Sequence, residues 1–330
     1  MGENKRFLKA SSHYLLTQLA ILAASLISFP IIARVLSVEE YGVLSLCNTI
    51  LLFGVALSKL GLQNSIVRFY PEYRQQGKVP VFFHTYAVVC VVAGLVFFGV
   101  TGGLTGWVLA DEVAGIAWLV AGVVLLQTLF GYLTNFLRSQ EKTKIFALFN
   151  VVVRYLSVFG GLALIFLLNN GITCLFQAQV FAYGLLVVGL VFFLHKDFQG
   201  VGPFFSKELL HDSLKFGLPL IAFEISSIAL AFSDRFLITH FNGLKELGIY
   251  AVVYTLCMYI ADLIRQPISM AVGPMYNRIF AQQGEGEARK FLGNLGSIVY
   301  LFAFPVFAGV MGIREDLLAF LASEKYVAGA

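Results

Sequence analysis

Long runs of apolar residues, separated by short polar stretches, dominate this sequence. A transmembrane α-helix needs about 20 mostly apolar residues to cross about 30 Å of hydrocarbon, and nine runs are close to that length. They cover residues 14–33, 43–60, 79–100, 115–136, 145–168, 172–194, 216–237, 247–264 and 295–313. The pattern predicts an all-α integral membrane protein with about nine transmembrane helices.

A transmembrane β-barrel would instead show segments of about ten residues that alternate between apolar and polar positions. Residues 86–100 contain no charged or amide side chain, which favours helices. The longest connections lie around residues 196–215 and 265–290, and neither is large enough for a catalytic domain.

The composition agrees with lipid as the main solvent. Hydrophobic residues make up 58% of the 330 residues and charged residues 13%, against about 25% charged residues in soluble domains. The net charge of +4 is too dispersed to indicate a nucleic-acid partner. Cys47, Cys90, Cys174 and Cys257 all lie in apolar runs without CxxC spacing, so we interpret them as core residues and expect no metal or cofactor.

The distribution of Lys and Arg predicts the orientation, because cytoplasmic segments are enriched in both. The N-terminus and the even-numbered connections hold 17 of the 23: Lys5, Arg6, Lys9, Lys59, Arg68, Arg74, Lys78, Arg138, Lys142, Lys144, Lys196, Lys207, Lys215, Arg265, Arg278, Arg289 and Lys290. Five lie on the opposite side: Arg34, Arg235, Lys245, Arg314 and Lys325. We expect an uncleaved first helix, a cytoplasmic N-terminus and a C-terminus outside.

A weak internal repeat aligns the two halves of the chain. Gly42 falls over Gly248 at an offset of 206, and the segment 71–74 falls over 274–277 at an offset of 203. Six helices separate the copies, so the repeats are parallel, as in transporters with two rocking lobes. We expect a six-helix lobe over residues 1–200 and the first three helices of a second, incomplete lobe over 201–330. The alternative is that acidic-Gly turns recur because they end helices well.

Four segments carry a family resemblance. They are IARVLSVEEYG at 32–42, GLQNSIVRFYPEY at 61–73, SDRFLI at 233–238 and LGIY at 247–250. In this order they resemble the oligosaccharide flippases, or polysaccharide transporter family, of the multidrug/oligosaccharidyl-lipid/polysaccharide export superfamily.

The resemblance implies flipping of an undecaprenyl-diphosphate-linked oligosaccharide across the bacterial inner membrane by alternating access, for surface polysaccharide biosynthesis. It also implies a glycan polymerase and glycosyltransferases of the same pathway as partners. The resemblance implies 12 to 14 helices in two lobes. This chain stops after nine predicted helices, at a segment (324–328) similar to the family's connection into the tenth helix. We therefore expect a C-terminally truncated chain.

Two charged residues within spans are the main substrate-binding candidates. Arg154 lies nine residues after Ile145, about 14 Å into its helix, where a charge costs roughly 2.5–3.5 kcal/mol. Its planar fork suits a diphosphate; the alternative is a snorkelling or acid-paired Arg without a ligand. Glu224 either takes up and releases a proton during transport or neutralises Arg154. We predict that both side chains face a shared water-filled cavity.

Other polar residues have a simpler structural interpretation. Asp262, a second coupling candidate, is three residues from Arg265, which favours a local ion pair. Arg34, Asp234 and Arg235 lie near the outer ends of their helices, where their polar heads can reach the membrane interface. Four amides within spans either line a sugar path or bond between helices: Gln18, Asn48, Gln127 and Asn135.

Two other functions compete with glycan flipping. A drug or cation exporter of the same superfamily would favour an acidic cavity. The spans hold one basic candidate, Arg154, and one acidic candidate, Glu224, so the sign of the cavity charge stays open. A membrane-embedded glycan polymerase or ligase would need a sizeable outer loop with catalytic groups, which the short outer connections do not supply. The chain contains neither a P-loop nor a GxGxxG motif for a nucleotide.

The predicted orientation can be tested by thiol labelling in intact cells. In a chain without native cysteines, we expect a Cys placed at Gln76 or Gln140 to resist a membrane-impermeant reagent, and to react after the cells are permeabilised. Rapid labelling of either position from outside would refute the assignment.

Overall fold

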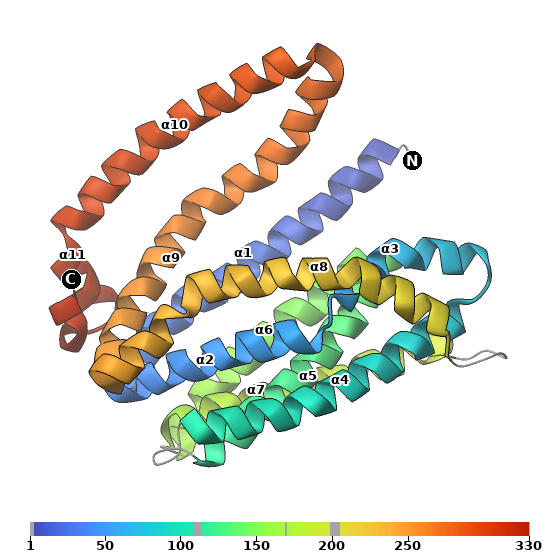
Figure 1. Cartoon of the computed structure of the whole chain (residues 1–330). Helices are drawn as coiled ribbons and strands as arrows, with labels where there is room; N and C mark the ends of the chain where they lie inside the picture. Colours follow the sequence, from blue (N-terminus) through green and yellow to red (C-terminus); the bar gives the residue numbers. More distant parts are fainter. Residues whose placement is uncertain (1–2, 109–113, 169, 199–204, 330) are drawn as a thin grey trace. The chain divides into compact units, whose positions relative to one another are not determined.

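A computed structural model describes residues 3–108, 114–168, 170–198 and 205–329, and these residues are helical with short connections (Figure 1). The helices of the first part are α1 (Glu3–Val35), α2 (Val38–Ser58), α3 (Leu62–Gln75), α4 (Val79–Val108), α5 (Ala114–Ser139), α6 (Thr143–Leu168) and α7 (Gly171–Leu194). The later ones are η1 (His195–Phe198), α8 (Lys207–Phe232), α9 (Asp234–Gln283), α10 (Glu285–Gly312), α11 (Arg314–Leu321) and η2 (Glu324–Gly329). The predicted all-α class is confirmed.

The chain forms two compact units, and α1 contributes to both. Unit 1 consists of Met1–Ser28 and Val43–Leu244, and unit 2 of Phe29–Gly42 and Lys245–Ala330. Pro30 lies inside α1, two residues past the division. The predicted lobes, 1–200 and 201–330, rest on the sequence repeat and stay a prediction.

Eight helical stretches of the described residues are long and apolar enough to cross a membrane. Seven of the nine predicted spans fall in separate stretches, whereas the seventh and eighth share one continuous run, Lys207–Asp262. Within this run α8 ends at Phe232 and α9 begins at Asp234, so the predicted span 216–237 extends past a helix end. The non-helical backbone of Gly243 (φ 87°, ψ 176°) then divides α9.

Two segments that we predicted as connections are helical instead. The connection after the second span contains α3, which buries Leu62, Ser65, Ile66 and Tyr70 along one face. Such a short amphipathic helix is missed by a search for continuous apolar runs. The connection predicted around 265–290 is also largely helix: α9 continues to Gln283, and only Gly284 separates it from α10, where the chain reverses direction (Figure 1).

An aromatic cluster holds α3, α4 and α5 together in unit 1. The ring centroids of Tyr70 and Phe136 are 5.3 Å apart, and those of Phe83 and Phe136 are 4.3 Å apart, both edge to face. Phe82, Phe83 and Phe136 are fully buried. Aromatic pairs in this arrangement are worth about 0.5–1.5 kcal/mol each beyond the area that they bury. The cluster therefore fixes α3, which does not itself resemble a membrane span, against two helices that do.

Backbone contact joins α3 to α8 in the same unit. Gly61 adopts the left-handed conformation (φ 66°) just before α3, and a Cβ atom there would overlap the backbone of Gly217 in α8. Next to this contact, the Ser65 hydroxyl donates to the carbonyl oxygen of Ser213 (2.9 Å), and the hydroxyl groups of Tyr86 and Ser213 are 2.6 Å apart. Small residues at this crossing allow the two helices to approach closely, as is common between membrane helices.

In unit 2, two cations bind the carbonyl ends of neighbouring helical segments. Arg34, in the last turn of α1, donates to the carbonyl oxygens of Phe320 and Ala322 near the end of α11. Lys325 donates in return to the carbonyl oxygens of Arg34 and Leu36, where α1 ends. The last carbonyls of a helix have no partner inside the helix, and cations there also interact favourably with the helix dipole.

The segments that the sequence repeat aligns are in contact within unit 2. Gly248, in the second copy, lies so close to the carbonyl group of Val38, in the first, that any side chain at position 248 would overlap it. Tyr41, also in the first copy, packs edge to face on Tyr326 with centroids 6.1 Å apart. The glycine of the second copy therefore has a packing role that is independent of any turn.

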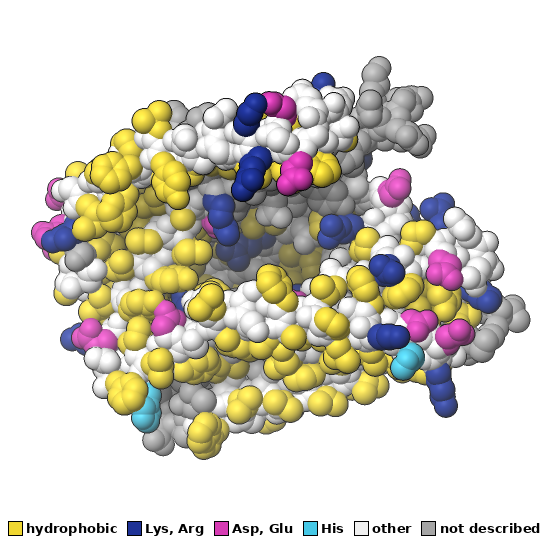
Figure 2. All heavy atoms as spheres, turned by 45° about the horizontal axis from the view of Figure 1, so that its top comes forward, with side chains coloured by type: hydrophobic (Ala, Val, Ile, Leu, Met, Phe, Trp, Pro, Cys, Tyr) yellow, Lys and Arg dark blue, Asp and Glu magenta, His cyan; other side chains and the backbone are white. Residues whose placement is uncertain are grey.

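Hydrophobic side chains cover much of the lipid-facing length of these helices. Figure 2 shows a broad band of hydrophobic side chains across the lower part of the molecule, with charged side chains gathered toward its two ends. Fully or largely exposed examples include Phe192, Leu167 and Leu230. In water such a surface would be an aggregation liability, whereas in a bilayer it is the expected outer face.

Two glycines allow the α3–α8 contact to be tested. Gly61 and Gly77 both have positive φ angles (66° and 69°), but a Cβ atom on Gly77 would meet nothing within 4 Å. We expect Gly77→Ala to cost about 1–2 kcal/mol, the penalty for a left-handed residue, and Gly61→Ala to cost clearly more, because it adds the overlap with Gly217. Thermal unfolding of the purified variants in detergent measures both, and equal losses would contradict the close contact.

Candidate functional site

Arg154 lies near the middle of α6 and bonds to α1. It is 11 residues from Thr143, the first residue of the helix, which corresponds to about 17 Å along the axis. Its Nη2 atom donates to the Ser25 hydroxyl oxygen (2.6 Å), and that hydroxyl donates in turn to the carbonyl oxygen of Ile21 (3.0 Å). The Nε atom is buried, and no described residue accepts a hydrogen bond from it.

No acidic side chain among the described residues lies within ion-pair distance of Arg154. The alternative of an acid-paired structural arginine therefore lacks its partner in this part of the chain. The next residue, Tyr155, donates its hydroxyl to the carbonyl oxygen of Ala20 (3.2 Å), so α6 makes two polar contacts with α1 within one turn. Arg154 is held by α1, and no acidic side chain of the described residues compensates its charge.

Glu224, half-buried in α8, faces α3. Its Oε2 atom accepts a hydrogen bond from the Gln63 side-chain nitrogen (3.2 Å). Lys59, directly after α2, also interacts electrostatically with Glu224. The charge of the carboxylate is therefore partly compensated by Lys59, which precedes α3, and by the hydrogen bond from Gln63, in the first turn of α3.

Lys59 and Gln63 were not among the predicted site residues. The sequence placed both in or beside a cytoplasmic connection, and Lys59 counted only toward the orientation. The structure instead turns Lys59 inward, where its Cε atom lies beside Gly131 of α5. The available signal in the sequence was that Lys59 and Gln63 are four residues apart, about one helical turn. This spacing indicates a shared partner only when the position of that partner, Glu224, is known.

Arg154 and Glu224 belong to the same unit, and no ion pair joins them. Neutralisation of Arg154 by Glu224, one of the two roles considered for the carboxylate, is therefore not what these contacts show. That both face a shared water-filled cavity stays a prediction, as does proton uptake by Glu224.

The remaining predicted residues divide into exposed and locally bonded ones. Gln18 and Asn48 are exposed, Gln127 is half-buried, and Asn135 donates to the carbonyl oxygen of Gly131 in its own helix (2.8 Å). Asp262 forms the expected ion pair with Arg265 (2.7 Å) in unit 2. A role of Asp262 in coupling remains a prediction.

The arginines near the outer helix ends are held by protein contacts. Arg235 is 5% exposed; its Nε atom donates to the Ser45 hydroxyl (2.8 Å) and its guanidinium lies 4.4 Å from the Phe232 ring centre. Together with the carbonyl contacts of Arg34, this favours the structural interpretation of both residues. Cys47, Cys90 and Cys174 are buried as predicted, whereas Cys257 is exposed, so its assignment to the core is wrong.

The fold is that of transporters of the multidrug/oligosaccharidyl-lipid/polysaccharide (MOP) superfamily. An inward-facing multidrug resistance MATE family transporter superposes with a TM-score of 0.69 and 14% identity, over 94% of this chain and 75% of its own. The MATE multidrug transporter DinF-BH in complex with R6G gives 0.68 and 15%, over 96% and 74%. A MOP superfamily transporter from Pyrococcus furiosus gives 0.60 and 16%, over 98% and 75%.

Sequence comparison narrows this class. Residues 31–329 match the family described as "Polysaccharide biosynthesis protein". Protein 1 of the Lsg locus of Haemophilus influenzae is 24% identical over 326 residues, which are 97% of this chain and 77% of that protein. The chain belongs to this polysaccharide biosynthesis protein family, and it is a multi-pass membrane protein.

These comparisons confirm the resemblance inferred from the four sequence segments at the level of the family, and the fold agrees with the superfamily. The family is one of polysaccharide biosynthesis proteins, and the fold is the one that transporters of the MOP superfamily have.

The contact between Arg154 and Ser25 predicts a stability difference between two serines of α1. Ser25→Ala removes the acceptor of a charged donor, whereas Ser28→Ala removes only a bond to the Ser25 carbonyl in its own helix (3.1 Å). Side-chain hydrogen bonds in membrane proteins average about 0.6 kcal/mol and reach about 1.7, so we expect Ser25→Ala near the upper value and Ser28→Ala near the mean. Unfolding by SDS from mixed micelles measures both. A loss for Ser28→Ala as large as that for Ser25→Ala would argue against the interhelical bond.

Proposed function

We propose that this protein flips a lipid-linked oligosaccharide, carried on undecaprenyl diphosphate, across the bacterial inner membrane by alternating access. Membership of the polysaccharide biosynthesis family supports a glycan substrate. The MOP transporter fold supports alternating access as the mechanism. A glycan polymerase and glycosyltransferases of the same pathway are the proposed partners, since they would consume and supply such a substrate.

The main support for an anionic substrate is the charge of Arg154, which no described acidic side chain compensates. A charge at this depth is costly, so an arginine there is expected to pair with an acid, a ligand or water. In the described part of the chain, Arg154 bonds to one neutral partner, Ser25, and no residue there accepts a hydrogen bond from its buried Nε atom. A guanidinium with free donors matches the paired oxygens of a diphosphate in a bidentate geometry.

The alternative, export of a drug or another cation, would require an uncompensated carboxylate. Glu224 is the natural candidate, and the multidrug transporters among the structural neighbours give this alternative its weight. However, Glu224 already accepts from Gln63 and interacts with Lys59, so its charge is less available than that of Arg154. The balance of the two sites favours an anion.

In the proposed cycle, Arg154 binds the diphosphate while the polyprenyl chain stays in the hydrocarbon. The amides Gln18, Asn48 and Gln127 offer hydrogen-bonding groups to the sugars. Glu224 or Asp262 would supply coupling to protons by changing protonation between the two states. The cytoplasmic N-terminus that the Lys and Arg count predicts would place substrate loading on the side where lipid-linked sugars are assembled.

An arginine-to-lysine exchange tests the role of Arg154. Lysine keeps the charge but lacks the planar fork, so we expect Arg154→Lys to weaken binding of undecaprenyl diphosphate to the purified chain by about tenfold, one lost bidentate contact. The matched control is Arg289→Lys, the same exchange at an exposed position of α10. Binding is measured by titration in detergent micelles, with thermal unfolding to confirm that both variants fold.

Three outcomes distinguish the hypotheses. A loss confined to Arg154→Lys supports diphosphate recognition. Equal binding by the wild type and Arg154→Lys would remove Arg154 from the site. Tight binding of a hydrophobic cation such as R6G that depends on Glu224, without binding of the diphosphate, would favour the drug exporter.

A further inference from the structure

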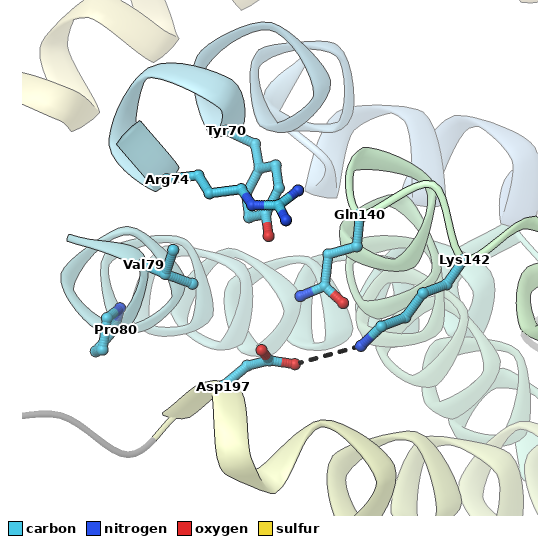
Figure 3. Close-up of a pocket in the computed structure, with 7 residues that line it drawn as sticks. All are labelled: Tyr70, Arg74, Val79, Pro80, Gln140, Lys142 and Asp197. Atoms are coloured by element: carbon cyan, nitrogen blue, oxygen red, sulfur yellow. Dashed lines mark ion pairs between the residues drawn. The ribbon is translucent and has the colours of Figure 1, made fainter. Parts of the chain in front are cut away.

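A polar cleft of about 430 Å³ opens at one end of unit 1, apart from Arg154 and Glu224. Its lining comes from the end of α3, the start of α4, the connection between α5 and α6, and η1. Figure 3 shows the residues that line it: Tyr70, Arg74, Val79, Pro80, Gln140, Lys142 and Asp197. The volume falls within the roughly 300–1,000 Å³ of small-molecule sites in proteins.

The cleft offers donors that are poorly occupied. The Arg74 guanidinium points toward the centre of the cleft (Figure 3), and within the described residues it makes no side-chain hydrogen bond or ion pair. Lys142 lies across from it and contacts Asp197 at 3.9 Å, close to the outer limit of an ion pair. Because both partners are about a third exposed, this pair contributes little and is easily exchanged.

The cleft also offers acceptors. The Oε1 atom of Gln140 is buried, and no described residue donates to it. Asp197 adds a carboxylate whose only described ion-pair partner is Lys142. Leaving a buried carbonyl oxygen without a donor is unfavourable, so a ligand that brings N–H groups to Gln140 and Asp197 would relieve that cost. The cleft thus places two cations next to two acceptors.

We propose that this cleft binds the phosphoethanolamine headgroup of a membrane phospholipid. The phosphate would lie between Arg74 and Lys142, and the ammonium would donate to Asp197 and the Gln140 oxygen. A purely anionic headgroup would use the cations equally well but would meet the carboxylate of Asp197, so the zwitterion is the better match. This site goes beyond the proposed transport function and does not depend on it.

The position of the cleft agrees with a lipid rather than a soluble ligand. Arg74 lies in the last turn of α3, Val79 begins α4 and Lys142 directly precedes α6, so the cleft lies where apolar helices end. This is the depth at which phospholipid headgroups meet a membrane protein. By the count of Lys and Arg, this end of the bundle is the cytoplasmic one.

Lipid titration followed by native mass spectrometry of the whole purified chain tests the proposal. The probes are phosphatidylethanolamine and phosphatidylglycerol with identical acyl chains. We expect the wild type to bind the first about tenfold more tightly, and Arg74→Gln or Lys142→Gln to lose about tenfold in that affinity. The matched controls, Lys78→Gln and Lys144→Gln, remove an exposed cation a few residues from Arg74 and Lys142, at positions that do not line the cleft.

The variant Asp197→Asn separates the zwitterion from a general anion site. Removing the carboxylate should weaken phosphatidylethanolamine and strengthen phosphatidylglycerol, so that the preference disappears or inverts. Lys142→Arg should retain binding, which would show that Lys142→Gln acts through charge. If Arg74→Gln does not fold, the pair Lys142→Gln and Lys144→Gln carries the test.

Several results would overturn the proposal. Equal losses in Lys144→Gln and Lys142→Gln would show general surface attraction, and an unchanged lipid preference in Asp197→Asn would exclude the ammonium subsite. Displacement of the lipid by inorganic phosphate at equal concentration would assign the cleft to a soluble phosphate ligand. None of these results depends on transport, so the proposed function could fail while this site stands, or the reverse.

Discussion

The cost of an unpaired polar group in hydrocarbon governs this structure. Inside a bilayer no water is available to backbone N–H and C=O groups, so a spanning segment forms a helix in which each group finds an internal partner. The same constraint applies to side chains: Ser25, Thr49, Thr85 and Thr128 all return their hydroxyl protons to a carbonyl oxygen one turn earlier. The groups that do not follow this rule are therefore informative.

Two kinds of charged residue follow from this constraint. Arg235 and Arg34 satisfy their donors through the protein's own hydroxyl and carbonyl oxygens, so their charges stabilise the connections between helices. Among the described residues, Arg154 has one such partner, Ser25, and none accepts a hydrogen bond from its buried Nε atom. The first kind has a structural role, and the second is the kind that we propose to bind a ligand.

The short helix α3 links the elements that the candidate sites require. Gly61 and Ser65 bring it against α8, where Gln63 contacts Glu224, and Tyr70 anchors its other face in the aromatic cluster. Its last turn then presents Arg74 to the polar cleft at the end of the unit. One amphipathic helix thus connects the carboxylate within the membrane to the cations at its surface, although too few of its residues are apolar for it to span a bilayer itself.

The sequence alone determined the helical class, most of the spans and the family, because each depends on local hydrophobicity or a short motif. From the cost of one buried charge it also predicted a binding role for Arg154, which stays a prediction. It did not predict α3 or the continuation of α9 to Gln283, because amphipathic helices outside the hydrocarbon lack a continuous apolar run. Only the tertiary structure decided which partners meet. Ser25 is 129 residues from Arg154, Gln63 is 161 from Glu224, and the cleft combines four separate segments. Such pairings arise from the packing of whole helices, and no local pattern along the chain encodes which faces will meet.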